Sequence, residues 1–301
     1  MILTVKSEND SMRIDKYLSE ECETLSRSFL QKMLKDGLVS INGKTAKASG
    51  KVVPGDIISF EVPDMSEPDI LPENIPLDIL YEDSDVIVVN KPKGMVVHPD
   101  QTYHSGTLVN ALLYHCKDLS GINGVKRPGI VHRIDRDTTG SVIACKNDEA
   151  HQKIAEQLKE HSICRVYVAI VHGVLKEDEG TIHTLIGRSP KDRKKMAVVT
   201  HGGKDAITHY KVIKRFREYT YVECRLETGR THQIRVHMAS IHHPLVGDEV
   251  YSHLKPPAGN LQGQTLHAKT LGFLQPTTGE YIETEAPLPG YFQNLLSKLP
   301  E

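Results

Sequence analysis

A cluster of charged side chains directly precedes an apolar segment near the middle of the chain. The cluster consists of His132, Arg133, Asp135, Arg136 and Asp137. A carboxylate among arginines stays ionised because the guanidinium groups favour its charged form, and it can then act as a nucleophile or accept a proton. The alternative for Asp135 is a structural ion pair with a neighbouring Arg, which is the more common role of such an Asp.

The residues after the cluster predict the element that would position Asp135. Residues 141–145 (Ser-Val-Ile-Ala-Cys) form a short segment with β-branched residues, which is typical of a buried strand. Residues 137–140 (Asp-Thr-Thr-Gly) have the composition of a turn, since Asp can bond its own backbone and Gly tolerates positive φ. We therefore expect Asp135 on a loop that leads into a core strand, where functional side chains are often presented.

A second candidate, Tyr167, lies in a predicted strand over residues 164–173. The alternation of a strand places Arg165, Tyr167 and Ala169 on one face and Val166, Val168 and Ile170 on the other. Tyr167 could therefore line a cleft, although a half-buried tyrosine with a satisfied hydroxyl is the more common role in a strand.

Arg230 is a third candidate because it lies at a predicted junction between a strand and a helix. Gly229 is expected to end the strand, and Arg230 or Thr231 to begin the helix. The inner face of that helix is predicted by the helical spacing of Ile234, Met238 and Ile241. A side chain at such a junction is well placed for function.

These segments resemble the motifs of a known family. Residues 131–140 (Val-His-Arg-Ile-Asp-Arg-Asp-Thr-Thr-Gly) are similar to the H-R-[LI]-D-x-x-T-[ST]-G signature of the RluA/RluD family of RNA pseudouridine synthases. Further blocks match in the family's order at residues 90–94, 97–99, 165–169 and 226–248. Two mild departures are Arg165, where Lys is common, and Gln275, where His is usual.

The resemblance implies an enzyme that converts uridine in RNA to pseudouridine with no cofactor and no metal ion. Asp135 is then the essential carboxylate, acting either as a nucleophile or on a glycal-like intermediate. Tyr167 would stack on the extruded base and could help to remove the C5 proton. Arg230 would be the ionic partner of Asp135, with Arg133 and Arg235 as weaker candidates. The expected substrate-binding residues are His132, Arg133, Arg136, Thr139, Lys91, His98, His232 and Arg235.

Residues 1–62 resemble the S4 RNA-binding domain. Two short amphipathic helices are expected from residue 13 and over residues 26–37, followed by a hairpin with an Asn-Gly turn and a further strand. The resemblance suggests a phosphate-binding surface on Arg27, Lys32, Lys35, Lys44 and Lys47. The alternative is an ordinary solvated face, which is the usual role of basic residues on exposed helices.

The remaining sequence sets the expected domains and fold class. Residues 63–76 are rich in Pro and acidic residues and are expected to form a linker, and residues 77–301 the catalytic domain. We expect an α+β catalytic domain: a mixed, mostly antiparallel sheet flanked by helices, with a central RNA-binding cleft. The S4-like unit should be a small α/β domain. Residues 188–217 are the most basic segment, and residues 191–203 within it have the composition of a mobile loop.

Composition limits the other classes of function. The 301 residues carry a net charge of −2, contain five scattered cysteines without a C-x-x-C motif, and have no apolar run of 18 residues. This favours a cytoplasmic protein with reduced thiols and no membrane partner. The 16 histidines show no metal-ligand spacing, and no phosphate-binding glycine motif occurs.

We therefore predict a monomeric RNA pseudouridine synthase that acts on large-subunit ribosomal RNA. The alternatives are a synthase that acts on transfer RNA and a non-catalytic S4-type RNA-binding protein. A further rival is a hydrolase that uses Asp135 with His132 and releases free uracil.

Overall fold

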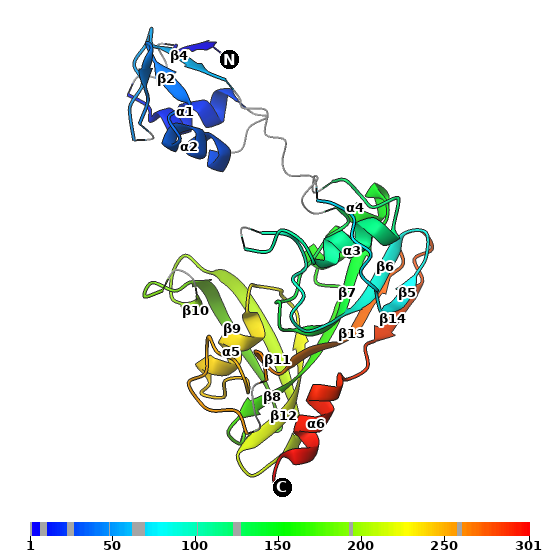
Figure 1. The fold of residues 1–301 in the computed structure, drawn as a ribbon. Coiled ribbons are helices and arrows are strands. Elements are labelled where there is room, and N and C mark those ends of the chain that lie inside the picture. The colour runs from blue at the N-terminus through cyan, green and yellow to red at the C-terminus, as the bar shows by residue number, and fades with distance from the viewer. Residues whose placement is uncertain are drawn as a thin grey trace. The chain divides into compact units, whose positions relative to one another are not determined.

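The computed structural model describes residues 2–6, 11–22, 27–47, 49–61, 70–100, 102–122, 128–192, 195–257 and 261–301. The chain divides into two compact units, Met1–Pro68 and Asp69–Glu301 (Figure 1). The first half of the expected linker, residues 63–69, falls outside the described residues, and residues 70–76 are in neither a helix nor a strand.

The smaller unit packs two helices on a four-stranded sheet. The helices are α1 (Ile14–Glu21) and α2 (Arg27–Lys35). The sheet order is β1 (Ile2–Thr4), β4 (Ile57–Phe60), β2 (Val39–Ile41) and β3 (Lys44–Thr45). The expected Asn-Gly turn joins β2 to β3, with positive φ at Asn42 and Gly43. Tyr17, Leu30 and Met33 are buried between the helices and the sheet, as amphipathic helices require.

The larger unit is built on a ten-stranded sheet (Figure 1). Its main path runs β10 (Met196–Val199), β9 (Glu179–Arg188), β11 (Lys204–Arg215), β12 (Tyr219–Leu226), β8 (Cys164–His172), β13 (Leu266–Leu274), β7 (Thr139–Cys145), β6 (Val86–Lys91) and β5 (Ile79–Glu82). β14 (Tyr281–Glu285) pairs with β13 off this path. The pairing of β13 with β7 is parallel and the others are antiparallel, which confirms the expected mixed, mostly antiparallel sheet.

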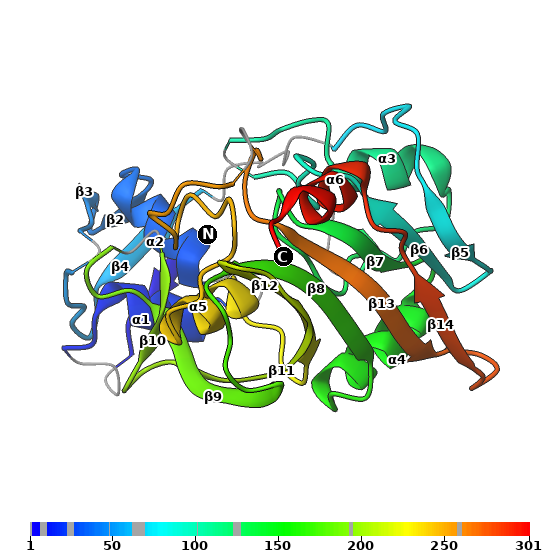
Figure 2. The ribbon, with the colours of Figure 1, turned by 90° about the horizontal axis from the view of Figure 1, so that it is seen from below.

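Helices cover both faces of this sheet. α3 (Leu108–His115) shares a buried apolar cluster with Val142 and Ala144 of β7, whereas α4 (Asp148–Lys159) shares another with Ile143 and Cys145. The alternation along β7 therefore places these helices on opposite faces of the sheet, as Figure 2 shows. Since β7 is buried at every position, it is the core strand expected after Asp135.

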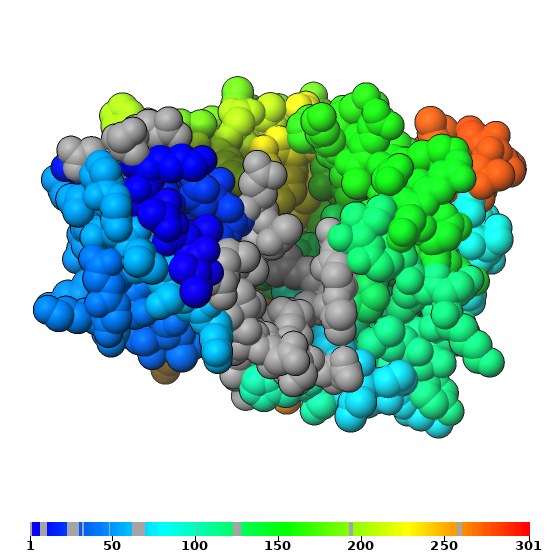
Figure 3. All heavy atoms as spheres, turned by 90° about the horizontal axis from the view of Figure 1, so that it is seen from above, coloured from blue at the N-terminus to red at the C-terminus, as the bar shows by residue number. Residues whose placement is uncertain are grey.

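Two more helices complete the layers. α5 (Gln233–Ser240) packs on the same face as α3, and α6 (Gly290–Lys298) packs against Val168 and Ile170 on the other face of β8. Tyr167 shares its cluster with the α3 and α5 side, so the predicted separation of the two faces of this strand is confirmed. The outer side of α4 is polar and exposed, and Figure 3 shows this green part of the chain on the surface of the larger unit.

Two local expectations are corrected by the structure. The segment expected as a mobile loop contains β10, which forms a hairpin with β9. α5 begins at Gln233 because His232, with φ 56°, turns the chain just before it.

All five cysteines are free thiols. None of the helices in the described ranges is both long and apolar enough to cross a lipid bilayer.

Candidate active site

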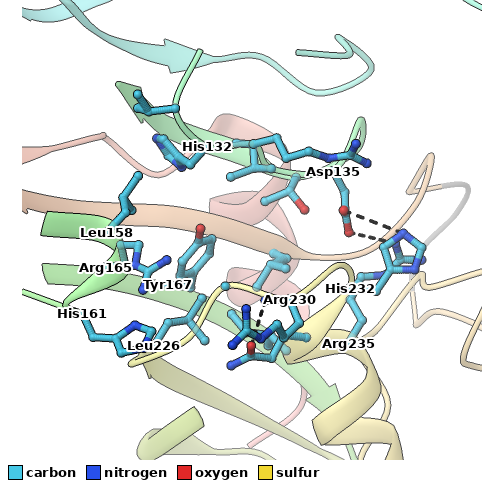
Figure 4. A pocket seen from close by; sticks show the side chains of 18 of the residues that line it. His132, Asp135, Leu158, His161, Arg165, Tyr167, Leu226, Arg230, His232 and Arg235 are labelled. Atoms are coloured by element: carbon cyan, nitrogen blue, oxygen red, sulfur yellow. Dashed lines mark hydrogen bonds and ion pairs between the residues drawn. The ribbon is translucent and has the colours of Figure 1, made fainter. Parts of the chain in front are cut away.

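A cavity of about 490 Å³ opens on the α5 side of the sheet. Its wall combines the loop before β7, the start of β8, the end of β12 and the start of α5 (Figure 4). The predicted site residues that line it are His132, Arg133, Asp135, Tyr167, Arg230, His232 and Arg235. Three segments that are far apart in the sequence thus converge on one pocket.

The backbone ahead of β7 fixes the position of Asp135. Thr138 donates its amide hydrogen to the carbonyl oxygen of Asp135 at 3.1 Å, which closes a turn. Gly140 has φ 106°, and a Cβ at this position would overlap the carbonyl oxygen of Ala268 on β13. The loop can therefore approach β13 this closely only with glycine at residue 140.

Asp135 forms an ion pair with Arg235, the third residue of α5. Nη1 of Arg235 lies 2.9 Å from Oδ2 of Asp135, and the two side chains are 6% and 18% exposed, respectively. Arg235 in turn donates Nε and Nη2 to Asp248 at 2.7 and 2.9 Å. One guanidinium therefore bridges a buried carboxylate and a partly exposed one, which is the bidentate geometry that arginine favours.

The charges in this bridge stabilise one another. Burial acts to raise the pKa of Asp248, but the hydrogen bonds and charge of Arg235 outweigh it and lower that pKa. Burial likewise acts to lower the pKa of Arg235, and its bonds with Asp248 and Asp135 raise it above the usual value. Asp248 and Arg235 are therefore both ionised at neutral pH.

The expected pairing of Arg230 with Asp135 is wrong. Nε of Arg230 donates to the carbonyl oxygen of Asp205 at 2.7 Å, and Arg235 pairs with Asp135 instead. The physical reason is the left-handed residue His232, because it delays the start of α5 to Gln233 and directs Arg235 toward the loop. Arg230 still lines the cavity, where it can contact the substrate.

Tyr167 forms part of the cavity wall and is 8% exposed. Figure 4 shows its ring facing the cavity between the Asp135 loop and Arg230. Burial raises the pKa of Tyr167 to about 12. The phenol is therefore protonated at neutral pH, and its ring offers a flat surface on which a base can stack.

Two histidines in the wall have defined hydrogen bonds. Nε2 of His132 accepts from the amide of Ile143 at 3.0 Å, and burial lowers the pKa of His132 to about 4. His132 is therefore a neutral side chain that ties the loop to β7. Nδ1 of His232 lies 2.9 Å from the hydroxyl of Tyr251, and its Nε2 lies 3.8 Å from Oδ1 of Asp135.

Four other predicted binding residues lie away from this cavity. A second cavity of about 370 Å³ adjoins the first, and His98 and Arg136 line it. Nζ of Lys91 is buried and donates to three backbone carbonyl oxygens, including that of Arg136 at 3.0 Å. Thr139 is buried and shares a hydrogen bond of 2.8 Å with His267. Lys91 and Thr139 thus stabilise the Asp135 loop and the start of β7 through buried hydrogen bonds. The expectation that they contact the substrate is corrected.

Two residues of the cavity region had been given no role from the sequence. Asp248 lies within a block that matched the family, but no pattern linked it to an arginine 13 positions earlier. The sequence places Arg165 on the same strand face as Tyr167 but assigns it no role, and in the structure it lines the cavity beside Tyr167.

The predicted S4 surface is described in part. Lys35, Lys44 and Lys47 are exposed, as phosphate binding would require. The side chains of Arg27 and Lys32 lie outside the described residues.

Among the described residues, one group outside the cavity has metal-ligand chemistry: Glu82, His115 and Cys116. Nζ of Lys146 lies 3.1 Å from Glu82 and already supplies a positive charge there. Burial raises the pKa of Cys116 to about 11, so this residue is a thiol rather than a metal-binding thiolate at neutral pH. The group is therefore better explained as an ion pair beside a buried thiol.

Comparisons with known proteins place these features in a wider context. The sequence profile described as RNA pseudouridylate synthase matches residues 85–240, and that of the S4 domain matches residues 12–58. A Bacillus subtilis protein named as an uncharacterized RNA pseudouridine synthase, YlyB, is 52% identical over 99% of this chain and 97% of its own length. A Neisseria meningitidis protein named ribosomal large subunit pseudouridine synthase D is 44% identical over 99% of this chain and 81% of its own.

A solved structure has a similar fold. Human RNA pseudouridylate synthase domain containing 1 superimposes with a TM-score of 0.59 at 26% identity, covering 72% of this chain and 85% of the human chain.

Proposed function

We propose that this chain, which belongs to the RNA pseudouridylate synthase family, converts uridines of large-subunit ribosomal RNA to pseudouridine. The assignment of the reaction rests on the family, and the assignment of the RNA rests on relatives named for the large ribosomal subunit. The observation that carries the proposal is Asp135, which is held in a cavity by Arg235 and shares that cavity with Tyr167. Asp135, Tyr167 and Arg230 are the proposed catalytic residues.

The reaction is an isomerisation with no net change in atoms or electrons. The N1–C1′ bond of uridine breaks, and its electron pair moves to the uracil ring. The base turns and a C5–C1′ bond forms, after which C5 loses its proton and N1 gains one. Asp135 would assist either by attack on the sugar or by moving the 2′ proton, and both routes need an ionised carboxylate shielded from bulk water.

The uridine must leave its helix to reach this cavity. Extrusion of a base costs about a few kcal/mol, and less for an unpaired nucleotide. Tyr167 would recover part of this cost by stacking, at about 1–3 kcal/mol per base. The extruded base leaves a gap in the RNA helix that a side chain could fill. Arg133 is better placed than His132 to do so, because Arg133 is exposed beside the cavity whereas His132 is hydrogen-bonded to Ile143.

Basic residues of both units would hold the RNA backbone. Arg188, Lys204, Lys211 and Arg217 are exposed on or beside strands of the larger unit, and Lys35, Lys44 and Lys47 on the smaller. Two linked binding units raise the effective concentration of RNA at the cavity. We also propose that the protein acts as a monomer in the cytoplasm.

Mapping of pseudouridines in the RNA of the host, with and without this gene, tests the proposal. We expect specific large-subunit positions to lose the modification and to regain it with the intact gene but not with the D135N variant. Loss only in transfer RNA would assign the alternative substrate, and no loss at any position would favour a non-catalytic RNA-binding protein. Release of free uracil by the purified protein would instead identify a hydrolase.

A further inference from the structure

Arg165 is a buried cation without a carboxylate partner in the described part of the chain. It is 7% exposed, and burial is the largest influence on its pKa, which it lowers. Nη2 donates to the carbonyl oxygen of Glu227 at 2.7 Å, and neither Nε nor Nη1 has a hydrogen-bond partner among the described residues. Nε is enclosed by protein atoms, so Nη1 is the donor that a ligand in the cavity can reach. A buried guanidinium with unused donors is costly to the fold, and a ligand that accepts a hydrogen bond from Nη1 would reduce this cost.

The surroundings of Arg165 keep its guanidinium at the cavity wall. A Cβ on Gly229 would lie 2.7 Å from Nη1 of Arg165, so the bare backbone of this glycine provides the space. Arg230 also lines the cavity, and its positive charge further lowers the pKa of Arg165. Neither arginine is neutralised by a neighbouring acid in the described structure, so this end of the cavity favours electron-rich groups.

The position of Arg165 relative to Tyr167 and Asp135 indicates which group it meets. In Figure 4 the Tyr167 ring lies between Arg165 and the Asp135 carboxylate. A uracil that stacks on Tyr167 with its C1′ atom at Asp135 has its N1 edge toward Asp135. The opposite edge, which carries C4 and O4, then points toward Arg165.

We propose that Arg165 donates a hydrogen bond to O4 of the extruded uracil and stabilises the uracil anion formed when the N1–C1′ bond breaks. The proposal rests on the proposed isomerase function. The electron pair released to N1 spreads onto O2 and O4, so a hydrogen bond from a guanidinium to O4 strengthens as the bond breaks. Cytosine presents an amino group at this position, which would face a second donor, so the same contact selects uracil.

A combined change of substrate and protein tests this contact. The target uridine in a short RNA is replaced by 4-thiouridine, whose sulfur is the weaker hydrogen-bond acceptor. Single-turnover rates on both RNAs are compared for the wild type, R165M and R165K. The ratio of the two rates within one variant is independent of the fraction of protein that is folded. Comparison of this ratio between variants also cancels the intrinsic difference in reactivity between uridine and 4-thiouridine.

We expect the rate on uridine RNA divided by the rate on 4-thiouridine RNA to be roughly tenfold or more larger in the wild type than in R165M. A factor of this size corresponds to the loss of one charged hydrogen bond. R165K should retain part of this difference. The matched control is K159M, which removes an exposed cation lining the same cavity and should keep the wild-type ratio.

Equal ratios in the wild type and R165M would overturn the proposal and leave Arg165 a packing role. Loss of sensitivity to 2-thiouridine instead of 4-thiouridine would also overturn it, because the contact would then be to O2. A wild-type protein that forms no pseudouridine on either RNA would refute the proposed function itself, which separates the two failures.

Discussion

Arg235 donates a hydrogen bond to Oδ2 of Asp135 at 2.9 Å and leaves Oδ1 without a donor in the described structure. Nε2 of His232 lies 3.8 Å from Oδ1. Because Asp248 occupies the other edge of the guanidinium, Arg235 cannot turn to bind both oxygens of Asp135. Oδ1 is therefore the oxygen that we expect to act on the substrate.

The D135N variant should lose at least about a thousandfold in the rate of isomerisation, because an amide neither attacks nor accepts a proton. Its stability and RNA affinity should change little, since Arg235 keeps its two bonds to Asp248. Release of tritium from RNA with 5-tritiated uridine measures the rate. D137N is the control, because that carboxylate pairs with exposed Arg136. Wild-type turnover in D135N would remove Asp135 from the chemistry.

Asp248 is expected to position Arg235 without touching the substrate. In D248N the buried guanidinium loses one of its two charged partners, and removal of one member of a buried pair costs about 3–5 kcal/mol of the free energy of unfolding. Urea denaturation measures this cost. The exposed neighbour Glu249 provides the control variant, E249Q, which should retain wild-type stability.

A purely structural role for Asp248 would lower the amount of folded enzyme and leave kcat per folded molecule unchanged. We expect kcat itself to fall by roughly tenfold or more with little change in KM, because a loosened Arg235 misplaces Asp135 in the transition state. Active-site titration combined with steady-state rates distinguishes these outcomes.

Tyr167 is expected to act mainly through its ring. Its pKa of about 12 keeps the hydroxyl protonated, so Y167F should bind RNA normally and lose roughly tenfold in rate if the hydroxyl helps the C5 proton to leave. Y167A should lose more, because stacking contributes about 1–3 kcal/mol. Y210F, on β11, which β12 separates from β8 in the sheet, is the control. An unchanged rate in Y167F would limit Tyr167 to stacking and packing.

Much of this site could be predicted from local patterns. The composition of residues 137–145 predicts a turn and a buried strand, and β7 follows that pattern because each of its residues is buried. The alternation around Tyr167 predicts which face meets the cavity, since β8 obeys the two-residue period of a strand. These features depend only on neighbours in the sequence.

The ionic partner of Asp135 could not be predicted in this way. The choice between Arg230 and Arg235 depends on one left-handed residue, His232, which decides where α5 begins. The pairing also spans 100 positions between Asp135 and Arg235 and requires the fold to bring the two segments together. The strand β10 was missed for a similar reason, because its pairing with β9 overrides the loop-like composition of its flanks.

The lowered pKa of His132 predicts a loss of stability in acid. Burial, followed by the charge of Arg165, lowers its pKa to about 4, whereas an unfolded chain has a His pKa of about 6.5. Below pH 6.5 the unfolded state therefore binds a proton that the folded state rejects, and the free energy of unfolding decreases until the pH reaches about 4. Between pH 7 and pH 5 this residue alone should account for about 2 kcal/mol.

The H132Q variant isolates this contribution, because Gln can accept the amide hydrogen of Ile143 and cannot titrate. Urea denaturation at pH 7 and pH 5 should show a smaller loss of stability in H132Q than in the wild type. His237 provides the matched comparison, since burial also lowers its pKa to about 4 and H237Q should flatten the profile in the same direction. If H132Q and the wild type lose the same stability between these pH values, His132 takes up its proton in the folded state, and the bond to Ile143 does not hold it neutral.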